Sequence, residues 1–207
     1  MCAHRKPGLS ERELVSESSL QNLEFHPLTP DRWSDFELLF GKNGACGGCW
    51  CMWWRLKRSD FAKSTGRKNK RMMKKVVDSG QVPGILAYAD GIPVGWCSVA
   101  SRETYPVLER SWTLKRIDDE HVWSVVCFFV ARPFRRKNLM TSLLEAATAY
   151  AKEHGAKIVE GYPVEPKGRR MSWSEGFTGI VSAFRRAGFV EALRRSPGRP
   201  IMRHSIG

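Results

Sequence analysis

The segment from residue 121 to residue 151 constrains the fold more than any other. It begins with HVWSVVCFFV, an almost continuous run of β-branched and aromatic residues. Such a run is typical of a strand that is covered on both faces. The basic stretch ARPFRRKN follows, and from Leu139 onward apolar residues recur at helical spacing as far as Ala151. A strand that passes directly into a helix predicts a right-handed crossover to a parallel strand, here at 156–162.

The rest of the chain predicts a mixed arrangement of helices and strands. Short apolar runs predict strands at 23–28, 84–88, 93–99, 189–194 and 200–204, and amphipathic or capped segments predict helices at 32–40, 69–78 and 179–187. Asp90-Gly91 is the dipeptide of a tight hairpin between the second and third strands. We therefore expect an α/β fold of the mixed α+β kind, with a central mixed sheet of about 6–7 strands flanked by helices.

Length and composition suggest one domain. We expect the 207 residues to form a single domain over 21–207, preceded by a mobile tail over 1–20. The tail is charged throughout, which does not fit a secretory signal, and no apolar run approaches the roughly 18 residues that span a bilayer. With no export signal, the six cysteines are expected to be reduced and the protein cytoplasmic, without a membrane partner.

The formal net charge is +13, and much of it is local. Between Arg55 and Lys75 there are ten basic residues and one acid, Asp60. Such a run can attract a polyanion, but a solvated helix face is the simpler interpretation. No nucleic-acid-binding motif accompanies it, so nucleic acid is not an expected partner.

The junction between the buried strand and its helix is a candidate anion site. The first backbone N–H groups of a helix lack internal partners and, together with the helix dipole, favour an anion such as phosphate. Four basic residues surround this point: Arg132, Arg135, Arg136 and Lys137. Neither a Walker loop nor the dinucleotide-binding GxGxxG pattern is present.

The sequence from Val130 to Met140 resembles the pyrophosphate-binding loop of the GNAT acetyltransferase superfamily, and the late segment FRRAGF, 184–189, resembles its closing helix. The order of elements is similar from about residue 23 to the C-terminus. The resemblance implies an acyl-coenzyme A-dependent N-acetyltransferase that moves an acetyl group from acetyl-CoA to a primary amine of a small molecule or peptide. Whether the protein is a monomer or a homodimer stays open.

The resemblance also implies where the cofactor binds. Backbone groups of Phe128, Phe129 and Val130 would contact the pantetheine arm. The pyrophosphate would be held by the segment of Arg135, Arg136, Lys137, Asn138, Leu139, Met140 and Thr141, and Phe184 would lie nearby.

Three positions depart from the superfamily pattern. Asn138 replaces a glycine, so we expect it to adopt a positive φ, which asparagine tolerates. Met140 replaces a small residue, so its side chain must lie on the core side of the helix. Phe184 stands where many members have a tyrosine that protonates the leaving thiolate.

Other residues are therefore needed for proton transfer. Glu165 or Glu160, which flank the end of the strand at 156–162, are candidates for the base, and Tyr162 is a candidate for the acid. An ordinary surface carboxylate and a packed tyrosine are the alternatives.

The loop ACGGCWCMWWR, 45–55, is rich in cysteine and tryptophan. Trp50, Trp53 and Trp54 are expected to line the acceptor pocket, because the segment after the first helix does so in the superfamily; packing in the core is the alternative. No metal site is predicted, since Cys46, Cys49 and Cys51 lack a second pair of ligands, although a redox pair stays open.

The sequence also allows an alternative function. The changes at Asn138, Met140 and Phe184 also fit a catalytically impaired GNAT-like module that binds a polyanion or a protein partner.

Overall fold

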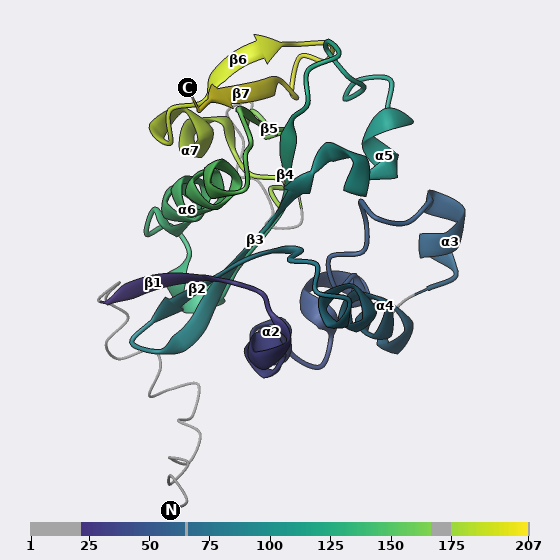
Figure 1. The fold of residues 1–207 in the computed structure, drawn as a ribbon, viewed down its shortest axis with the longest axis vertical. Helices are drawn as coiled ribbons and strands as arrows, with labels where there is room; N and C mark the ends of the chain where they lie inside the picture. The colour runs from purple at the N-terminus through teal and green to yellow at the C-terminus, as the bar shows by residue number, and fades with distance from the viewer. Residues whose placement is uncertain (1–21, 65, 167–174, 207) are drawn as a thin grey trace, which may run out of the picture.

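The computed structural model describes residues 22–64, 66–166 and 175–206; the expected tail, 1–20, lies outside this part of the chain. The described strands form one seven-stranded sheet in the order β1-β2-β3-β4-β5-β7-β6 (Figure 1). The strands are β1 (Leu23–Pro27), β2 (Gly84–Ala89), β3 (Ile92–Ser101), β4 (Trp123–Val130), β5 (Ile158–Gly161), β6 (Val190–Leu193) and β7 (Ile201–Ser205).

The predicted crossover is confirmed. β4 and β5 are parallel, with α6 (Leu139–Glu153) between them in sequence, and every other strand pair is antiparallel. The mixed sheet of about 6–7 strands is therefore confirmed, with strand ends within about two residues of the predicted ones, as is usual for assignments from sequence.

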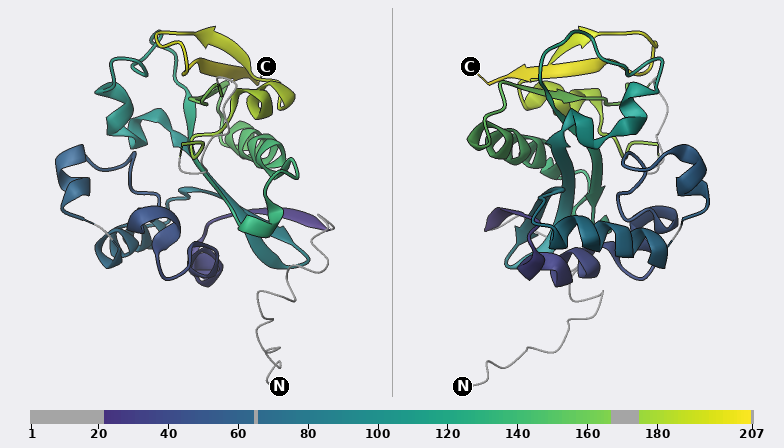
Figure 2. Two further views of the ribbon diagram at one scale, coloured as in Figure 1. Left: turned by 180° about the vertical axis from the view of Figure 1, so that it is seen from behind. Right: turned by 45° about the vertical axis from the view of Figure 1, so that its right-hand side comes forward.

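Helices cover both faces of the sheet (Figures 1 and 2). α6 and α7 (Val181–Arg186) lie on one face, and α2 (Trp33–Phe40), α3 (Arg58–Ala62), α4 (Arg67–Asp78) and α5 (Pro106–Glu109) lie on the other. The apolar stripe of α6 is buried in the main core, as its spacing predicted. The sequence did not predict α3 and α5, because helices this short carry little periodicity. No helix in the described ranges is both long and apolar enough to cross a membrane.

β4 and β5 part from one another halfway along β4. Their pairing extends from Trp123↔Val159 to Val125↔Gly161, and β4 then continues to Val130 without a partner on that side in β5. The segment 177–181 lies against both diverging chains: the N–H of Phe128 donates to the carbonyl of Phe177 at 2.6 Å, and the N–H of Val164 donates to that of Gly179 at 2.9 Å. The sheet thus has a gap that is filled by the protein's own backbone.

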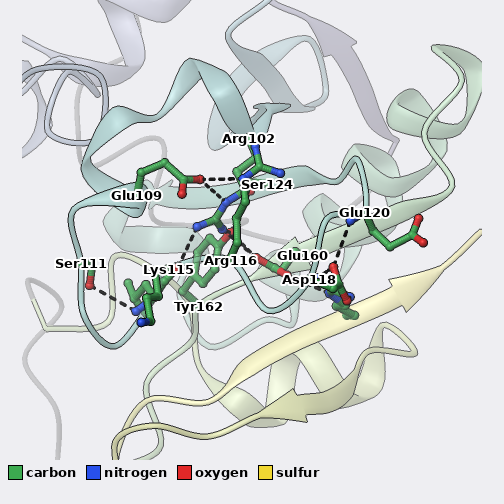
Figure 3. Close-up of polar contacts among 12 residues, drawn as sticks. Arg102, Glu109, Ser111, Lys115, Arg116, Asp118, Glu120, Ser124, Glu160 and Tyr162 are labelled. Carbon is green, nitrogen blue, oxygen red and sulfur yellow. Dashed lines mark hydrogen bonds and ion pairs between the residues drawn. The ribbon is translucent and has the colours of Figure 1, made fainter.

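A buried polar network holds β4, β5 and β7 together on the α5 side (Figure 3). Arg102, only 1% exposed, donates to Glu160 at 2.8 Å, to the Tyr162 hydroxyl at 2.5 Å and to Glu109 at 2.8 Å. The second Glu160 oxygen accepts from Arg203 at 2.8 Å. Each buried charge therefore has a partner of opposite sign, which burial requires.

Candidate functional site

The loop before α6 forms a cradle of backbone donors. Arg136 and Asn138 both have positive φ, 63° and 61°, so the expectation for Asn138 is confirmed. No hydrogen bond joins the backbone N–H of Asn138, Leu139 or Met140 to any described residue. These N–H groups lie at the positive end of the helix dipole, where an anion is stabilised.

The side chains around this cradle are basic. No acidic residue occurs between His121 and Leu144. Arg135 donates through Nε to the carbonyl of Val130 at 2.9 Å, and burial, together with the charge of Arg132, lowers its pKa. Arg186, which the sequence analysis did not select, approaches Thr141 Oγ1 at 3.4 Å from α7. Its place in the closing helix was the only sequence signal for it. The loop therefore fits a phosphate-bearing group.

Three apolar side chains of the predicted cofactor site belong to the core or pack against it. Met140 is half-buried and packs against the main core, as the substitution required, so it does not crowd the loop. Leu139 is 1% exposed and offers only its backbone. Phe184 is fully buried against Phe128 and Phe189, so its side chain is part of the core, and its place near the cofactor stays a prediction.

The predicted pantetheine contacts are partly engaged within the protein. The N–H of Phe128 is bonded to Phe177, and the carbonyl of Val130 accepts from Arg135. Only after the Phe177 carbonyl withdraws can the Phe128 N–H bind a ligand. The expectation that these groups are free on the strand edge is therefore corrected for Phe128 and Val130.

An apolar pocket of about 260 Å³ lies against β4 on the face opposite α6, since Phe40 of α2 and Phe61 of α3 are among its lining residues. Its lining includes Trp53, Trp54, Phe61, Phe129 and Phe177. Trp53 packs edge to face on Phe61, with ring centroids 5.0 Å apart, and Trp54 lies 6.3 Å from the Phe177 ring. The pocket therefore adjoins the gap between β4 and β5 and suits an apolar or aromatic group.

Trp50 does not line this pocket. It is 3% exposed and stacks on Phe40, with ring centroids 5.7 Å apart, inside the core beneath α2. Gly44 allows this packing, since a Cβ there would lie 2.2 Å from the Trp50 indole nitrogen. The structure thus corrects the expectation for Trp50 and keeps Trp53 and Trp54 at the pocket.

Four thiols line the pocket: Cys46, Cys49, Cys51 and Cys127. The pKa of Cys51 is lowered by interaction with Cys127 and by the hydrogen bond from the Trp96 indole, while Cys51 in turn raises the pKa of Cys127. Ala45, Trp50 and Cys51 are non-glycine residues with positive φ. Such strained backbone is often found at functional sites. No set of three His, Cys, Asp or Glu residues within the described ranges is arranged as a metal site.

The predicted proton-transfer residues do not reach the pocket. Tyr162 is fully buried, and its hydroxyl bonds Arg102, Glu160 and Ser124. Glu160 is 1% exposed in the same network. Both side chains therefore have structural positions in the buried network, which corrects the prediction that Tyr162 serves as the acid and Glu160 as the base. Glu165 is more exposed, but its carboxylate is paired with Arg194 at 2.5 Å beside the β6–β7 turn.

The basic run of residues 55–75 is divided between elements. Part of it lies on α4, where Arg67, Lys68, Lys70, Arg71 and Lys74 line a groove beside Trp33 and Glu37. Lys70 pairs with Glu37 at 2.8 Å, and Lys74 pairs with Asp78. The charge on this groove is therefore partly neutralised within the molecule.

Comparisons with known proteins agree with this architecture. The model of the acetyltransferase (GNAT) family matches residues 50–167, more than half of the chain. The chain therefore belongs to the GNAT family and is an acetyltransferase of that family. No curated protein sequence is significantly similar to it.

Solved structures share the fold at low sequence identity. A GNAT acetyltransferase from Streptococcus agalactiae 2603 has a TM-score of 0.53 at 13% identity, covering 91% of this chain and 98% of its own. The PaiA N-acetyltransferase from Thermoplasma acidophilum, solved in complex with coenzyme A, has a TM-score of 0.51 at 14% identity, covering 89% and 99%. A GNAT acetyltransferase from Listeria monocytogenes has a TM-score of 0.54 at 11% identity, covering 89% and 95%.

Proposed function

We propose that this acetyltransferase transfers an acetyl group from acetyl-CoA to a primary amine of a small molecule or peptide. The observation that carries the proposal is the cradle of N–H groups at residues 138–140, which have no partner in the described part of the chain and are ringed by basic side chains. The cradle lies beside the gap between β4 and β5. The coenzyme A complex of a structural neighbour supports the choice of donor.

The proposed roles follow from position. Backbone N–H groups of residues 138–140 bind the pyrophosphate, and Arg136 and Lys137 neutralise its charge. The bound donor supplies a thioester whose carbonyl carbon an amine can attack. The pocket with Trp53 and Trp54 holds the acceptor, so the amine and the thioester meet at the gap.

Proton transfer falls to a small set of groups. The only titratable side chains that line the apolar pocket, among the described residues, are the four thiols. Because no carboxylate lines this pocket among the described residues, we expect the amine to bind there in its neutral form. Glu165 remains the proposed base for an incoming ammonium outside the pocket, provided that its pairing with Arg194 opens.

Calorimetry tests the donor site directly. Acetyl-CoA should bind the wild-type protein, and Arg136→Glu should weaken binding about tenfold or more, because a charge-assisted contact to phosphate becomes a repulsion. Lys152→Glu, the same reversal at the far end of α6, is the matched control and should bind normally. Acetylated product from an amine panel, detected by mass spectrometry, then tests turnover.

The same calorimetry can also refute the proposal. Folded wild-type protein that binds neither acetyl-CoA nor coenzyme A would refute the proposal. The alternative, a GNAT-fold module that binds a polyanion or a protein, would then be favoured.

A further inference from the structure

A second pocket lies beside the first, between the segment 54–59 and the segment 107–114. It has a volume of about 500 Å³ and shares Trp54 with the apolar pocket. Its lining includes four basic side chains and three hydroxyl groups: Lys57, Arg58, Arg110 and Arg199, with Ser59, Ser111 and Thr113. No carboxylate lines it among the described residues. Neither the fold nor the proposed donor site accounts for this concentration of positive charge.

These basic groups have no carboxylate partner in the described chain. None of the four forms an ion pair with any residue that the structure describes. The nearest acid in sequence to Arg110, Glu109, is already bound by Arg102 and Arg116 at 2.8 and 3.3 Å. Asp60 accepts a hydrogen bond from Ser59 at 3.4 Å and does not line the pocket. The positive charge is therefore available to a ligand.

Two buried donors beside this pocket also lack partners. Trp54 is 5% exposed, and its indole N–H has no acceptor in the described part of the chain. The Nε of Arg199 is likewise buried without a partner, although its Nη2 donates to Thr178 at 2.8 Å. Buried donors are normally satisfied, so two at one pocket point to a missing acceptor. Burial without a counter-charge also lowers the pKa of Arg199, which an anion would reverse.

We propose that this second pocket is the subsite for an anionic group, phosphate or carboxylate, of the acceptor. This inference rests on the proposed function, because it assigns the acceptor amine to a chemical class. The amine and an apolar body would occupy the pocket at Trp53 and Trp54, and the anionic group would reach past Trp54 to the basic side chains. Amines that carry an acidic group are then preferred over polyamines and neutral amines.

The subsite can be tested by binding alone. Calorimetry would compare phenyl phosphate and phenylacetate with benzyl alcohol as a neutral probe. We expect the two anions to bind more tightly than the alcohol, and we expect the double variant Lys57→Gln/Arg110→Gln to weaken them about tenfold or more. Both positions are exposed, so the fold should survive. Lys152→Gln/Lys157→Gln, exposed charges on and just after α6, removes the same total charge and should leave binding unchanged.

A second measurement uses matched acceptors. The ratio of kcat/KM for O-phosphotyramine over tyramine should exceed one in the wild-type protein and fall toward one in Lys57→Gln/Arg110→Gln. Equal affinity for anions and benzyl alcohol, or an equal loss in the control variant, would overturn the subsite. Acetyl-CoA binding is measured separately. Binding of the anions without binding of acetyl-CoA would support an anion site here but refute the proposed function. Binding of acetyl-CoA without preferential binding of the anions would refute the subsite alone.

Discussion

At the scale of single residues, Asn138 shows how a family position can change without losing its backbone geometry. Its φ of 61° and ψ of 5° are left-handed, and it directly precedes α6. Asparagine reaches this region more readily than other residues with a Cβ. The turn that presents the N–H groups of Leu139 and Met140, which have no partner among the described residues, therefore survives the absence of glycine.

This geometry predicts an ordered series of variants. Asn138→Gly should keep or slightly raise stability, whereas Asn138→Ala should lower the free energy of unfolding by about 1 kcal/mol, because alanine pays a steric cost at positive φ. Urea denaturation measures the difference. Asn43→Ala, at an exposed asparagine with φ of −89°, is the control and should change little. Equal effects at Asn43 and Asn138 would contradict the argument.

Some site residues could be identified from the sequence and others could not, because only some of them depend on local structure. Asn138 and Met140 could be judged from sequence, because their roles depend on local backbone and helical spacing. Tyr162 could not, because its burial depends on Arg102, which lies sixty positions away in sequence. The three tryptophans of this loop, at positions 50, 53 and 54, cannot be told apart from the sequence. In the structure, positive φ values at Trp50 and Cys51 direct the Trp50 side chain into the core, whereas Trp53 and Trp54 line the pocket.

At the scale of elements, the network around Arg102 joins strands that the chain connects only through distant segments. Ser124 of β4, Glu160 of β5 and Arg203 of β7 all bond within it. The strand order itself was predictable only in part: the crossover from β4 to β5 followed from the sequence pattern, whereas the insertion of β7 between β5 and β6 depends on these non-local contacts.

Removing the centre of this network should be costly. Arg102→Met should lower the free energy of unfolding by about 3–5 kcal/mol, because Tyr162 and Glu160 would lose a buried partner. Arg116→Met is the matched control. It also contacts Glu109, but it is 35% exposed, so its loss should cost less than about 1 kcal/mol. Chemical denaturation followed by circular dichroism compares the two, and similar losses would show that burial of Arg102 adds nothing.

At the scale of the whole molecule, the two candidate binding regions lie on opposite faces of the sheet. The cradle before α6 is on one face, and the two pockets that share Trp54 are on the other. The gap between β4 and β5 is the connection between them, and the segment 177–181 fills it. A donor held by the cradle can react with an acceptor in the pocket only through this gap.

This arrangement predicts the kinetics of donor binding. The observed rate of coenzyme A association should level off at high concentration, because withdrawal of the Phe177 carbonyl becomes rate-limiting. Stopped-flow tryptophan fluorescence can follow it, since Trp54 lies 6.3 Å from the Phe177 ring. Phe177→Ala, which loosens that contact, should raise the plateau rate. A rate that rises linearly without limit in the wild-type protein would exclude this gating.

In the proposed complex, the Phe177 carbonyl competes with the donor for the Phe128 N–H, to which it is now hydrogen-bonded. The measured dissociation constant equals the intrinsic one divided by the fraction of molecules in which the segment is open. An acceptor that contacts the Phe177 ring in its open position would enlarge that fraction and so tighten donor binding. Donor and acceptor would then be thermodynamically coupled through one strand-like segment of backbone, in addition to their contact at the reacting atoms.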